Sequence, residues 1–360
     1  MAMNSMRVRF VGCVAVGLFA GAFFGLPTRG RAQTAATVQA KSPAVAAAKK
    51  TLVVASDGTG QFKTVQEAVD ASPDGNVRIE IKPGEYRQVL SIKADGVELR
   101  GLGKRPEDVV LVYDNSAGTA GGTGKSGSVS VSGDDFRAQN LTIANDFEKR
   151  HGRTEQGSQA VALLLTGDRA ILRQVRLLGY QDTLYASSKS CHAADETGSC
   201  HASRQYFADC YIEGHVDFIF GDAKAVFDRC EIHGMAHSMV TITAQSRPRP
   251  EEDSGYLFRD CTVTAEAGAQ NILLGRPWRD YSTVVFLNTD FKVPLDPKGW
   301  LEWGGRLKTS DYEEFGSHGL AGDVTERVAP SRQLTAAEAA KDTIKAWLAG
   351  ADGWNPEAVR

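Results

Sequence analysis

A short strand pattern recurs along this chain and limits the folds that are open to it. An apolar residue is followed, after two intervening residues, by an apolar residue or Cys, and after one more intervening residue by Ile, Leu or Val. The copies are AQNLTI (138–143), LRQVRL (172–177), FADCYI (207–212), FDRCEI (227–232) and FRDCTV (258–263), with FLNTDF (286–291) as a looser sixth. Such alternation within each copy is typical of a strand with one buried face.

The spacing of the copies indicates how the strands are connected. Their central residues are separated by 34, 35, 20 and 31 residues, in the order Leu141, Val175, Cys210, Cys230 and Cys261. Strand repeats of this length favour an all-β coil of parallel strands, in which each turn buries its face on its neighbours. The irregular spacing then corresponds to loops of different lengths.

Two segments show helical rather than strand periodicity. Residues 64–72 (TVQEAVDAS) place apolar side chains on one helix face directly before Pro73, and we expect this helix to cap the first coil. Residues 335–350 (TAAEAAKDTIKAWLAG) predict a second helix, stopped by Gly350, that packs along the side or at the far end of the coil.

The first 32 residues have the composition of a secretory signal. Arg7 and Arg9 precede the apolar run 11–26, and small residues follow as far as Ala32. The next residues are Ala-rich and polar, as in a mobile leader. We therefore expect an exported protein, secreted or periplasmic, that is cleaved near Ala32. The expected organisation is a signal peptide (1–32), a flexible leader (33–50) and the coiled domain (51–360).

Charge gives no support for a nucleic-acid partner, because the 360-residue chain has a formal net charge of −3 and no basic block. The N-terminal apolar run is short for a membrane span, and no later run is long enough. We therefore expect no membrane association once the signal is removed. A coil with covered ends needs no partner subunit, so we expect a monomer.

Two acidic residues occupy the same offset in successive repeats. Asp182 lies seven residues after Val175, and Asp217 lies seven after Cys210. Strands stack at about 4.8 Å, so the two carboxyl groups should lie one above the other. One of them then keeps its proton with a raised pKa, while cations or donors hold the other anionic. This suits acid–base chemistry, although a structural turn with a shared proton fits the spacing equally well.

A second pair shares an offset in the later repeats. Gln245 lies fifteen residues after Cys230, and Arg276 lies fifteen after Cys261. We expect these two side chains to be in register on neighbouring turns, unless a loop insertion shifts one of them.

Many separate motifs, in order along the chain, resemble the pectin methylesterase (pectinesterase) family. The resemblance implies a right-handed parallel β-helix that hydrolyses the methyl esters of homogalacturonan, without a metal or other cofactor. Pectin or polygalacturonate is the implied partner. The matching stretches run from about residue 51 to the C-terminal GWNP: DGTGQFKTVQEAVDASP, IKPGEYRQVL, GSQAVAL, GYQDTLYA, RQYFADCYIEGHVDFIFGDA, ITAQSR, LGRPWRDYSTVVF and GWLEWGG.

The resemblance also implies a role for each matching catalytic position. Asp217 would be the nucleophile, and Asp182 would protonate the departing methanol and then activate water. Gln159 and Gln181 would donate to the oxyanion, a role that suits neutral amides. Arg276 would pair with Asp217 and keep it ionised and aimed.

Aromatic side chains are candidates for binding the apolar faces of a sugar polymer. Trp278 matches a sugar-stacking position of the family, and we expect Trp300 to belong to the core. Trp303 stays open between the two roles. Gln245 lies in a family motif and would either contact a subsite or support one from behind. The substrate-binding candidates are Trp278, Tyr185, Phe220, Gln245 and Trp303.

Cysteines raise two structural questions. In CHAADETGSCH (191–201), an exported chain favours a disulfide between Cys191 and Cys200, although these cysteines with His192 and His201 are also a candidate zinc set. The cysteines at the central repeat positions are expected to form a buried stack, either free or with one pair bridged: Cys210, Cys230 and Cys261.

Three alternatives to methyl ester hydrolysis remain at this stage. A β-helix lyase on the same polymer would need a calcium-binding acidic cluster and a basic proton abstractor, and the sequence assembles neither around Asp217. A non-catalytic glycan-binding or envelope-structural β-helix would be expected to lack one acid or the arginine, whereas Asp182, Asp217 and Arg276 are all present. A related esterase acting on another acyl ester is the third alternative.

Overall fold

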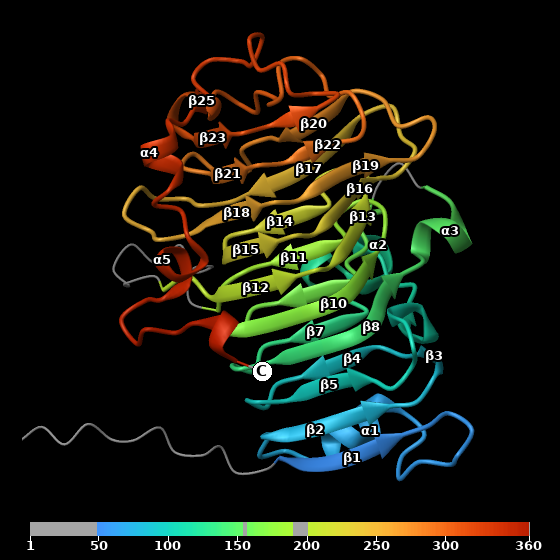
Figure 1. The fold of residues 1–360 in the computed structure, drawn as a ribbon. Coiled ribbons are helices and arrows are strands. Elements are labelled where there is room, and N and C mark those ends of the chain that lie inside the picture. The colour runs from blue at the N-terminus through green and yellow to red at the C-terminus, as the bar shows by residue number, and fades with distance from the viewer. Residues whose placement is uncertain (1–48, 154–156, 190–200, 360) are drawn as a thin grey trace, which may run out of the picture. The chain divides into compact units, whose positions relative to one another are not determined.

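The structure is a computed structural model that describes residues 49–153, 157–189 and 201–359. The expected signal peptide lies outside these residues, as does the expected disulfide between Cys191 and Cys200. Strand β1 (Lys50–Val54) begins at the last residue that we assigned to the leader. From β1 onward the chain coils steadily, and its colour in Figure 1 runs from blue to red along the stack of strands.

The strands form three parallel layers, and the long strands β8 and β10 belong to both of the first two. The first layer contains β1, β2 (Val77–Ile81), β5 (Glu98–Gly101), β8 (Arg137–Asn145), β10 (Ala170–Leu178), β12 (Arg204–Ala208), β15 (Lys224–Asp228), β18 (Gly255–Arg259), β21 (Thr283–Leu287), β23 (Asp311–Phe315) and β25 (Arg332–Gln333). The second adds β3 (Gly84–Arg87), β6 (Val109–Tyr113), β13 (Tyr211–Gly214), β16 (Glu231–Gly234), β19 (Thr262–Ala265), β22 (Asp290–Phe291) and β24 (His318–Gly319). The third contains β4 (Leu90–Ile92), β7 (Val129–Val131), β9 (Leu163–Leu165), β11 (Leu184–Ala186), β14 (Ile219–Gly221), β17 (Val240–Gln245) and β20 (Ile272–Gly275).

These layers make a parallel β-helix, as the repeat predicted, and its core is a ladder of equivalent side chains. Phe207, Phe227, Phe258 and Phe286 pair in register on successive strands. Their ring centroids are 4.8, 4.5 and 4.4 Å apart, and adjacent rings are tilted by 12° or less. Offset stacking of buried rings adds to the hydrophobic stabilisation of each rung.

A polar residue with a left-handed backbone precedes the central position of every repeat. This conformation turns the chain sharply, so each coil bends from the first layer to the second at the same point. Asn and Asp tolerate it best among non-glycine residues, which accounts for four of the six. The φ angle lies between 51° and 55° at Asn140, Gln174, Asp209, Arg229, Asp260 and Asn288.

The central cysteines stack as expected and are free. Arg176 pairs with Tyr211, and Tyr211 pairs with Glu231, which aligns Val175, Cys210 and Cys230 on successive rungs. Cys210, Cys230 and Cys261 are buried thiols without a disulfide. Burial, followed by contact with its two cysteine neighbours, raises the pKa of Cys230 well above its usual value.

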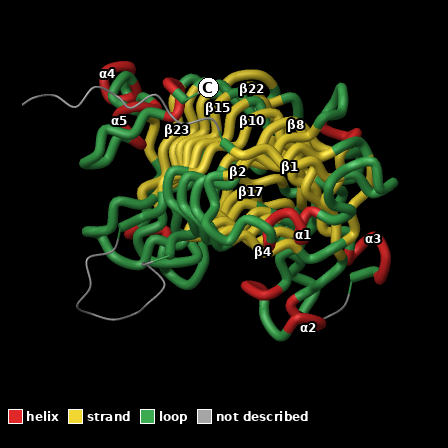
Figure 2. The backbone as a smooth tube through the Cα atoms, turned by 90° about the horizontal axis from the view of Figure 1, so that it is seen from below, coloured by secondary structure: helices red, strands yellow, loops and turns green. Residues whose placement is uncertain are grey.

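Helix α1 (Val65–Asp70) confirms the predicted cap of the first coil. The Thr64 hydroxyl accepts from the Glu67 N–H, and the Glu67 carboxylate accepts from the Thr64 N–H, so both orphan donors are satisfied. Val65, Ala68 and Val69 are buried in the core of the coil. Figure 2 shows α1 lying at the end of the stacked strands.

The single helix predicted for residues 335–350 is wrong, because two short helices occupy this segment. Thr335 caps α4 (Ala336–Ala339), and Thr343 caps α5 (Ile344–Leu348), so the second cap interrupts the helical run. The other helical turns are α2 (Ala117–Ala120), α3 (Phe147–His151), η1 (Pro106–Asp108), η2 (Thr123–Lys125), η3 (Leu307–Thr309) and η4 (Pro356–Ala358). Among the described helices, none has the length and hydropathy of a membrane span.

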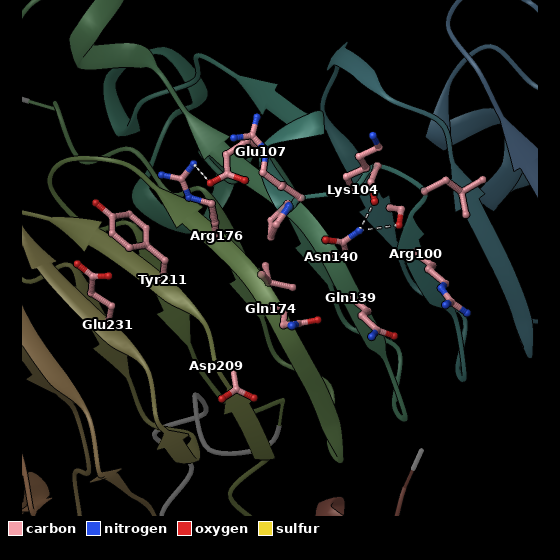
Figure 3. A pocket seen from close by; sticks show the side chains of 16 residues that line it. Arg100, Lys104, Glu107, Gln139, Asn140, Gln174, Arg176, Asp209, Tyr211 and Glu231 are labelled. Carbon is pink, nitrogen blue, oxygen red and sulfur yellow. Dashed lines mark hydrogen bonds and ion pairs between the residues drawn. The ribbon is translucent and has the colours of Figure 1, made fainter.

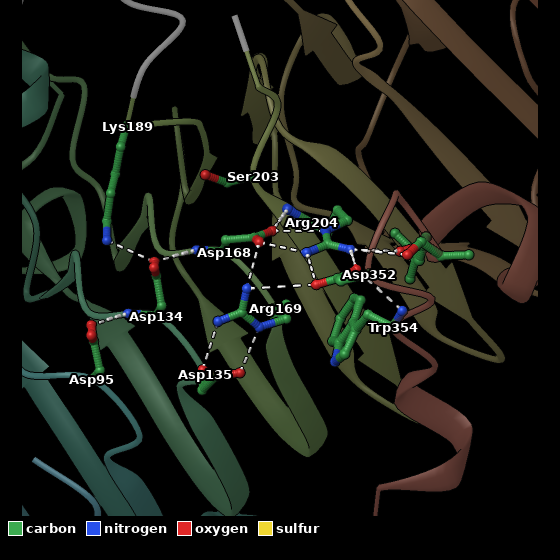
Figure 4. A network of polar contacts seen from close by, with 12 residues as sticks. Asp95, Asp134, Asp135, Asp168, Arg169, Lys189, Ser203, Arg204, Asp352 and Trp354 are labelled. Atoms are coloured by element: carbon green, nitrogen blue, oxygen red, sulfur yellow. Dashed lines mark hydrogen bonds and ion pairs between the residues drawn. The ribbon is translucent and has the colours of Figure 1, made fainter. Parts of the chain in front are cut away.

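The C-terminal tail is attached to the outer face of the first layer. Ile344 and Leu348 of α5 join an apolar cluster with Val226 and Leu257 of that layer. Asp352, which follows α5, is held by Arg204 of β12 (Figure 4). Arg204 Nη2 donates to Asp352 Oδ2 at 2.9 Å and to Asp168 Oδ2 at 2.7 Å. The hydrogen bonds from Arg204 lower the pKa of Asp352 to about 2.

We expect Phe227→Ala to lower the free energy of unfolding by roughly 3–5 kcal/mol, because it opens a cavity between two stacked rings. Urea denaturation of purified protein measures the loss. Val89→Ala is the control: Val89 is 43% exposed, and its truncation should change stability by less than about 0.5 kcal/mol. A loss below roughly 1 kcal/mol for Phe227→Ala would show that the ring ladder does not hold the rungs together.

Candidate active site

The two acids predicted from the repeat lie on neighbouring rungs of the third layer. Leu184 of β11 pairs with Ile219 of β14, so Asp182 and Asp217, each two residues earlier, are level with each other. The Asp182 N–H donates to the Val216 carbonyl at 3.1 Å. Both acids have left-handed backbones, with φ of 66° and 53°. The shared register of the acid pair is therefore confirmed.

The Asp217 carboxylate makes a two-point contact with Arg276, which directly follows β20. The Arg276 Nε donates to Asp217 Oδ1 at 2.8 Å, and Nη2 donates to Oδ2 at 2.7 Å. The Thr241 hydroxyl of β17 also donates to Oδ1 at 2.8 Å. The Asp217 side chain is 11% exposed, so it is shielded from bulk water but still reachable from the surface. A planar guanidinium fixes both the charge and the orientation of a carboxylate in this geometry.

Asp182 has the opposite environment. Burial raises its pKa well above the ordinary 3.8, the negative charge of Asp217 raises it further, and Arg276 opposes both effects only in part. Among the described residues, the pKa of Asp182 is set by burial, by Asp217 and by Arg276, and not by hydrogen bonds from side chains. Burial and the neighbouring carboxylate therefore both favour the protonated form of Asp182. The pair supplies one proton donor and one nucleophilic or basic oxygen.

The two glutamines implied as oxyanion donors lie beside the acids. The Ala160 N–H donates to the Gln181 carbonyl at 3.1 Å, which brings the residues around Gln159 and Gln181 together on adjacent rungs. Both side chains are half-buried. Within residues 49–153, 157–189 and 201–359, neither amide has a side-chain hydrogen-bond partner. The structure thus places the backbones of the two glutamines on adjacent rungs, with Gln181 directly before Asp182, and leaves their amides without side-chain partners among the described residues.

Three aromatic candidates gather on the outer face of the third layer. Tyr185 stacks on Phe220 with ring centroids 4.2 Å apart, and Trp278 packs against both at 6.5 and 5.9 Å. Tyr185 and Trp278 are half-buried, whereas Phe220 is 4% exposed. These rings therefore form an apolar surface beside the acids, of the kind that binds the face of a sugar ring.

Of the two other tryptophans considered from the sequence, Trp300 belongs to the core and Trp303 to the site. Trp300 is 1% exposed and stacks on Tyr312 at 4.1 Å, so the core assignment is confirmed. Trp303 is half-buried, and the Arg276 guanidinium lies 4.2 Å from the centre of its ring. Trp303 therefore belongs to the wall of the site, where a cation–π contact helps to place Arg276.

The predicted register of Gln245 with Arg276 is wrong by one residue. Thr243 pairs with Gly275, so Ala244 is level with Arg276. The reason is loop length: Val240 follows Cys230 by ten residues, whereas its partner Ile272 follows Cys261 by eleven.

Gln245 is fully buried and does not face a substrate. Its side-chain carbonyl accepts from the Arg247 N–H at 2.9 Å and from the Thr283 N–H at 3.0 Å. It therefore supports the fold behind the site, which was the second of the two expected roles.

Sequence reasoning missed two groups that support Asp217. Thr241 directly precedes the ITAQSR motif, and its contact with Asp217 follows from the register between β14 and β17, which the repeat offsets do not give. His215 is 1% exposed; its Nδ1 accepts from the Val216 N–H at 2.8 Å, and its Nε2 contacts Glu148 of α3 at 3.2 Å. These bonds fix the turn that carries Asp217.

A separate polar groove of about 840 Å³ lies over the second layer, and neither Asp182 nor Asp217 lines it. Figure 3 shows the groove with the ion pair between Arg176 and Glu107 and the hydrogen bonds of the Asn140 amide. Arg176 pairs with Glu107 at 3.1 Å, and the Asn140 amide donates to the carbonyls of Gly101 and Gly103. The acid pair, with its adjacent donors and rings, is therefore the better candidate for catalysis.

Comparison with known proteins agrees with this site. The sequence model of the Pectinesterase family matches residues 51–351. The chain is 37% identical over 327 residues to probable pectinesterase/pectinesterase inhibitor 17 of Arabidopsis thaliana, covering 86% of this chain and 59% of that protein. It is 36% identical over 303 residues to pectinesterase 31 of the same plant, covering 79% of this chain and 88% of the relative.

Solved structures give the same result for the fold. Pectin methylesterase from carrot superposes with a TM-score of 0.72 at 28% identity, covering 84% of this chain and 93% of that one. A pectin methylesterase in complex with a hexasaccharide superposes with a TM-score of 0.69 at 30% identity, covering 86% of this chain and 99% of that one. The chain therefore belongs to the pectinesterase family of carboxylic ester hydrolases.

Proposed function

We propose that this protein hydrolyses the methyl esters of pectin, releasing methanol and leaving free galacturonate carboxylates on the polymer. The observation that carries the proposal is the pairing of a buried Asp182, whose pKa burial raises, with an Asp217 clamped by Arg276. The names of the relatives support the substrate class. The aromatic surface of Tyr185, Phe220 and Trp278 supports a sugar polymer as substrate.

In the first step, an oxygen of Asp217 attacks the ester carbonyl carbon. The negative charge that develops on the carbonyl oxygen is stabilised by the amides of Gln159 and Gln181. Collapse of the tetrahedral intermediate breaks the bond to the methoxy oxygen, which takes the proton of Asp182 and leaves as methanol. Asp182 is suited to this role because burial keeps it protonated until a leaving group needs the proton.

In the second step, the now ionised Asp182 accepts a proton from water as the water oxygen attacks the same carbon. The bond to Asp217 breaks, and its carboxylate is restored in the clamp of Arg276. A covalent intermediate divides one difficult hydrolysis into two easier steps. Asp182 ends the cycle protonated, as it began.

The proposed export of the protein is supported by the composition of its first 32 residues alone. We propose that residues 1–32 direct the chain to the periplasm or the medium, where a cell-wall polymer is available. We propose further that the domain from residue 51 onward acts as a monomer on that polymer.

Asp217→Asn is expected to reduce methanol release from highly methylated pectin by at least about 10³-fold, because the amide cannot serve as the nucleophile. Asp260→Asn is the matched control, since Asp260 also has a left-handed backbone (φ 51°) but lies in the bend between the first two layers. It should retain activity within about threefold. Equal release by Asp217→Asn and wild type would remove Asp217 as nucleophile, and an inactive wild type would point to another ester.

The raised pKa of Asp182 predicts a pH-dependent loss of stability. Such a group contributes stability that is fully present below its ordinary value of about 3.8 and is lost as pH rises through the folded value. Relative to Asp182→Asn, the wild type should lose up to about 1.4 kcal/mol of unfolding free energy per pH unit in this window.

Chemical denaturation of both proteins at several pH values from about 4 to 8 measures this slope. Asp260→Asn, which keeps Asp182, should follow the wild-type dependence. Parallel curves for the wild type and Asp182→Asn would mean that Asp182 is ionised in the folded protein, contrary to its role as proton donor.

A further inference from the structure

Thr241 makes two hydrogen bonds with the same residue, Asp217, across one rung. The Asp217 N–H donates to Thr241 Oγ1 at 2.8 Å, and Thr241 Oγ1 donates to Asp217 Oδ1 at 2.8 Å. Because an N–H can only donate, the hydroxyl proton must point at the carboxylate. Thr241 is fully buried, so water does not compete for either bond. The backbone N–H of Asp217 thus fixes the direction of the Thr241 hydroxyl proton.

The two oxygens of Asp217 consequently differ in the number of donors they accept. Oδ1 accepts from the Thr241 hydroxyl and from Arg276 Nε, whereas Oδ2 accepts from Arg276 Nη2 alone. A carboxylate oxygen offers about two lone-pair sites. Among the described residues, both sites of Oδ1 are therefore occupied, while Oδ2 keeps one lone pair for another atom.

We propose that Thr241 is a positioning residue that selects Oδ2 of Asp217 as the attacking atom and holds Oδ1 in place. This inference rests on the proposed function, because it concerns the same nucleophile. It adds that the two carboxylate oxygens are not interchangeable during turnover.

The selection has a consequence for each step of the reaction. When Oδ2 bonds to the ester carbon and methoxide leaves with the proton of Asp182, Oδ1 becomes the carbonyl oxygen of a mixed anhydride. It can still accept from Thr241 and Arg276 Nε. When water adds and the bond from carbon to Oδ2 breaks, the electron pair returns to a carboxylate whose Oδ1 is already hydrogen-bonded. Thr241 therefore stabilises Asp217 as the leaving group, and during the attack it orients the carboxylate.

The chain offers a close control two residues further along β17. Thr243 is also fully buried, and its hydroxyl donates to the Leu274 carbonyl at 2.8 Å rather than to Asp217. Thr241→Val and Thr243→Val thus remove the same group from the same strand at equal burial. Thr241→Ser keeps the hydroxyl and loses only a methyl group.

The test measures methanol release from highly methylated pectin over a range of pH, with thermal unfolding measured in parallel. Thr241→Val should lower kcat roughly 10- to 100-fold with KM within about twofold, as for loss of a hydrogen bond to a charged group. The acid side of its pH–rate profile should move to higher pH, because a carboxylate with fewer donors takes up a proton more readily. Thr241→Ser should restore both quantities to within about threefold of wild type, and Thr243→Val should leave them there.

Three outcomes overturn the inference. The first is a Thr241→Val variant that matches Thr243→Val in kcat and in the position of the acid limb. The second is a Thr241→Val variant in which only the unfolding temperature falls, which is a structural role. The third is a folded Thr241→Ser variant that fails to restore activity. If Asp217→Asn is inactive in the same assay, these results reject the role of Thr241 alone, whereas an active Asp217→Asn rejects the proposed nucleophile and this inference with it.

Discussion

The hydrogen-bonded spacing of parallel strands is the constraint on which the rest of this structure depends. It holds residues at equivalent positions about 4.8 Å apart, whatever their chemistry. Applied to phenylalanines, it produces the ring ladder that contains Phe227 and stabilises the core. Applied to Asp182 and Asp217, it forces together two groups that repel each other when both are charged. The stability of the coil thus maintains an arrangement that two free carboxylates would avoid.

The order of the rungs explains why the two acids behave differently. Along the third layer, the strands run β11, β14, β17 and β20. Asp217 precedes β14, so it faces Thr241 of β17 and the guanidinium that follows β20. Asp182 lies one rung further from both and is left with burial and the charge of its neighbour. Two residues at the same offset therefore have different surroundings, because the guanidinium contacts Asp217 and lies on one side of the pair only.

The sequence predicted the features that depend on counting within a repeat. The coil follows from the recurring strand pattern, and the level placement of Asp182 and Asp217 follows from their equal offsets within it. The capping helix at 64–72 follows from its own helical periodicity. The residues that support the site depend instead on loop length. One extra residue before Ile272 shifted the register expected for Gln245.

The contact between Thr241 and Asp217 likewise follows from strand pairing rather than from a motif. The division between α4 and α5 was missed because Thr343 acts as a second cap inside a segment of good helix formers. Motif resemblance indicated the reacting groups and Arg276, whereas the structure added Thr241 and His215 as further supports of Asp217.

The attachment of the C-terminal tail has a consequence for how the coil avoids aggregation. The outer face of the first layer carries Tyr206, Val226, Leu257 and Val285, whose neighbours in the same cluster are Ile344 and Leu348 of the tail. A coil without this tail would present a continuous apolar strip along several rungs, which favours self-association. The tail therefore covers this apolar strip, and the hydrogen bond from Arg204 to Asp352 fastens it beyond α5.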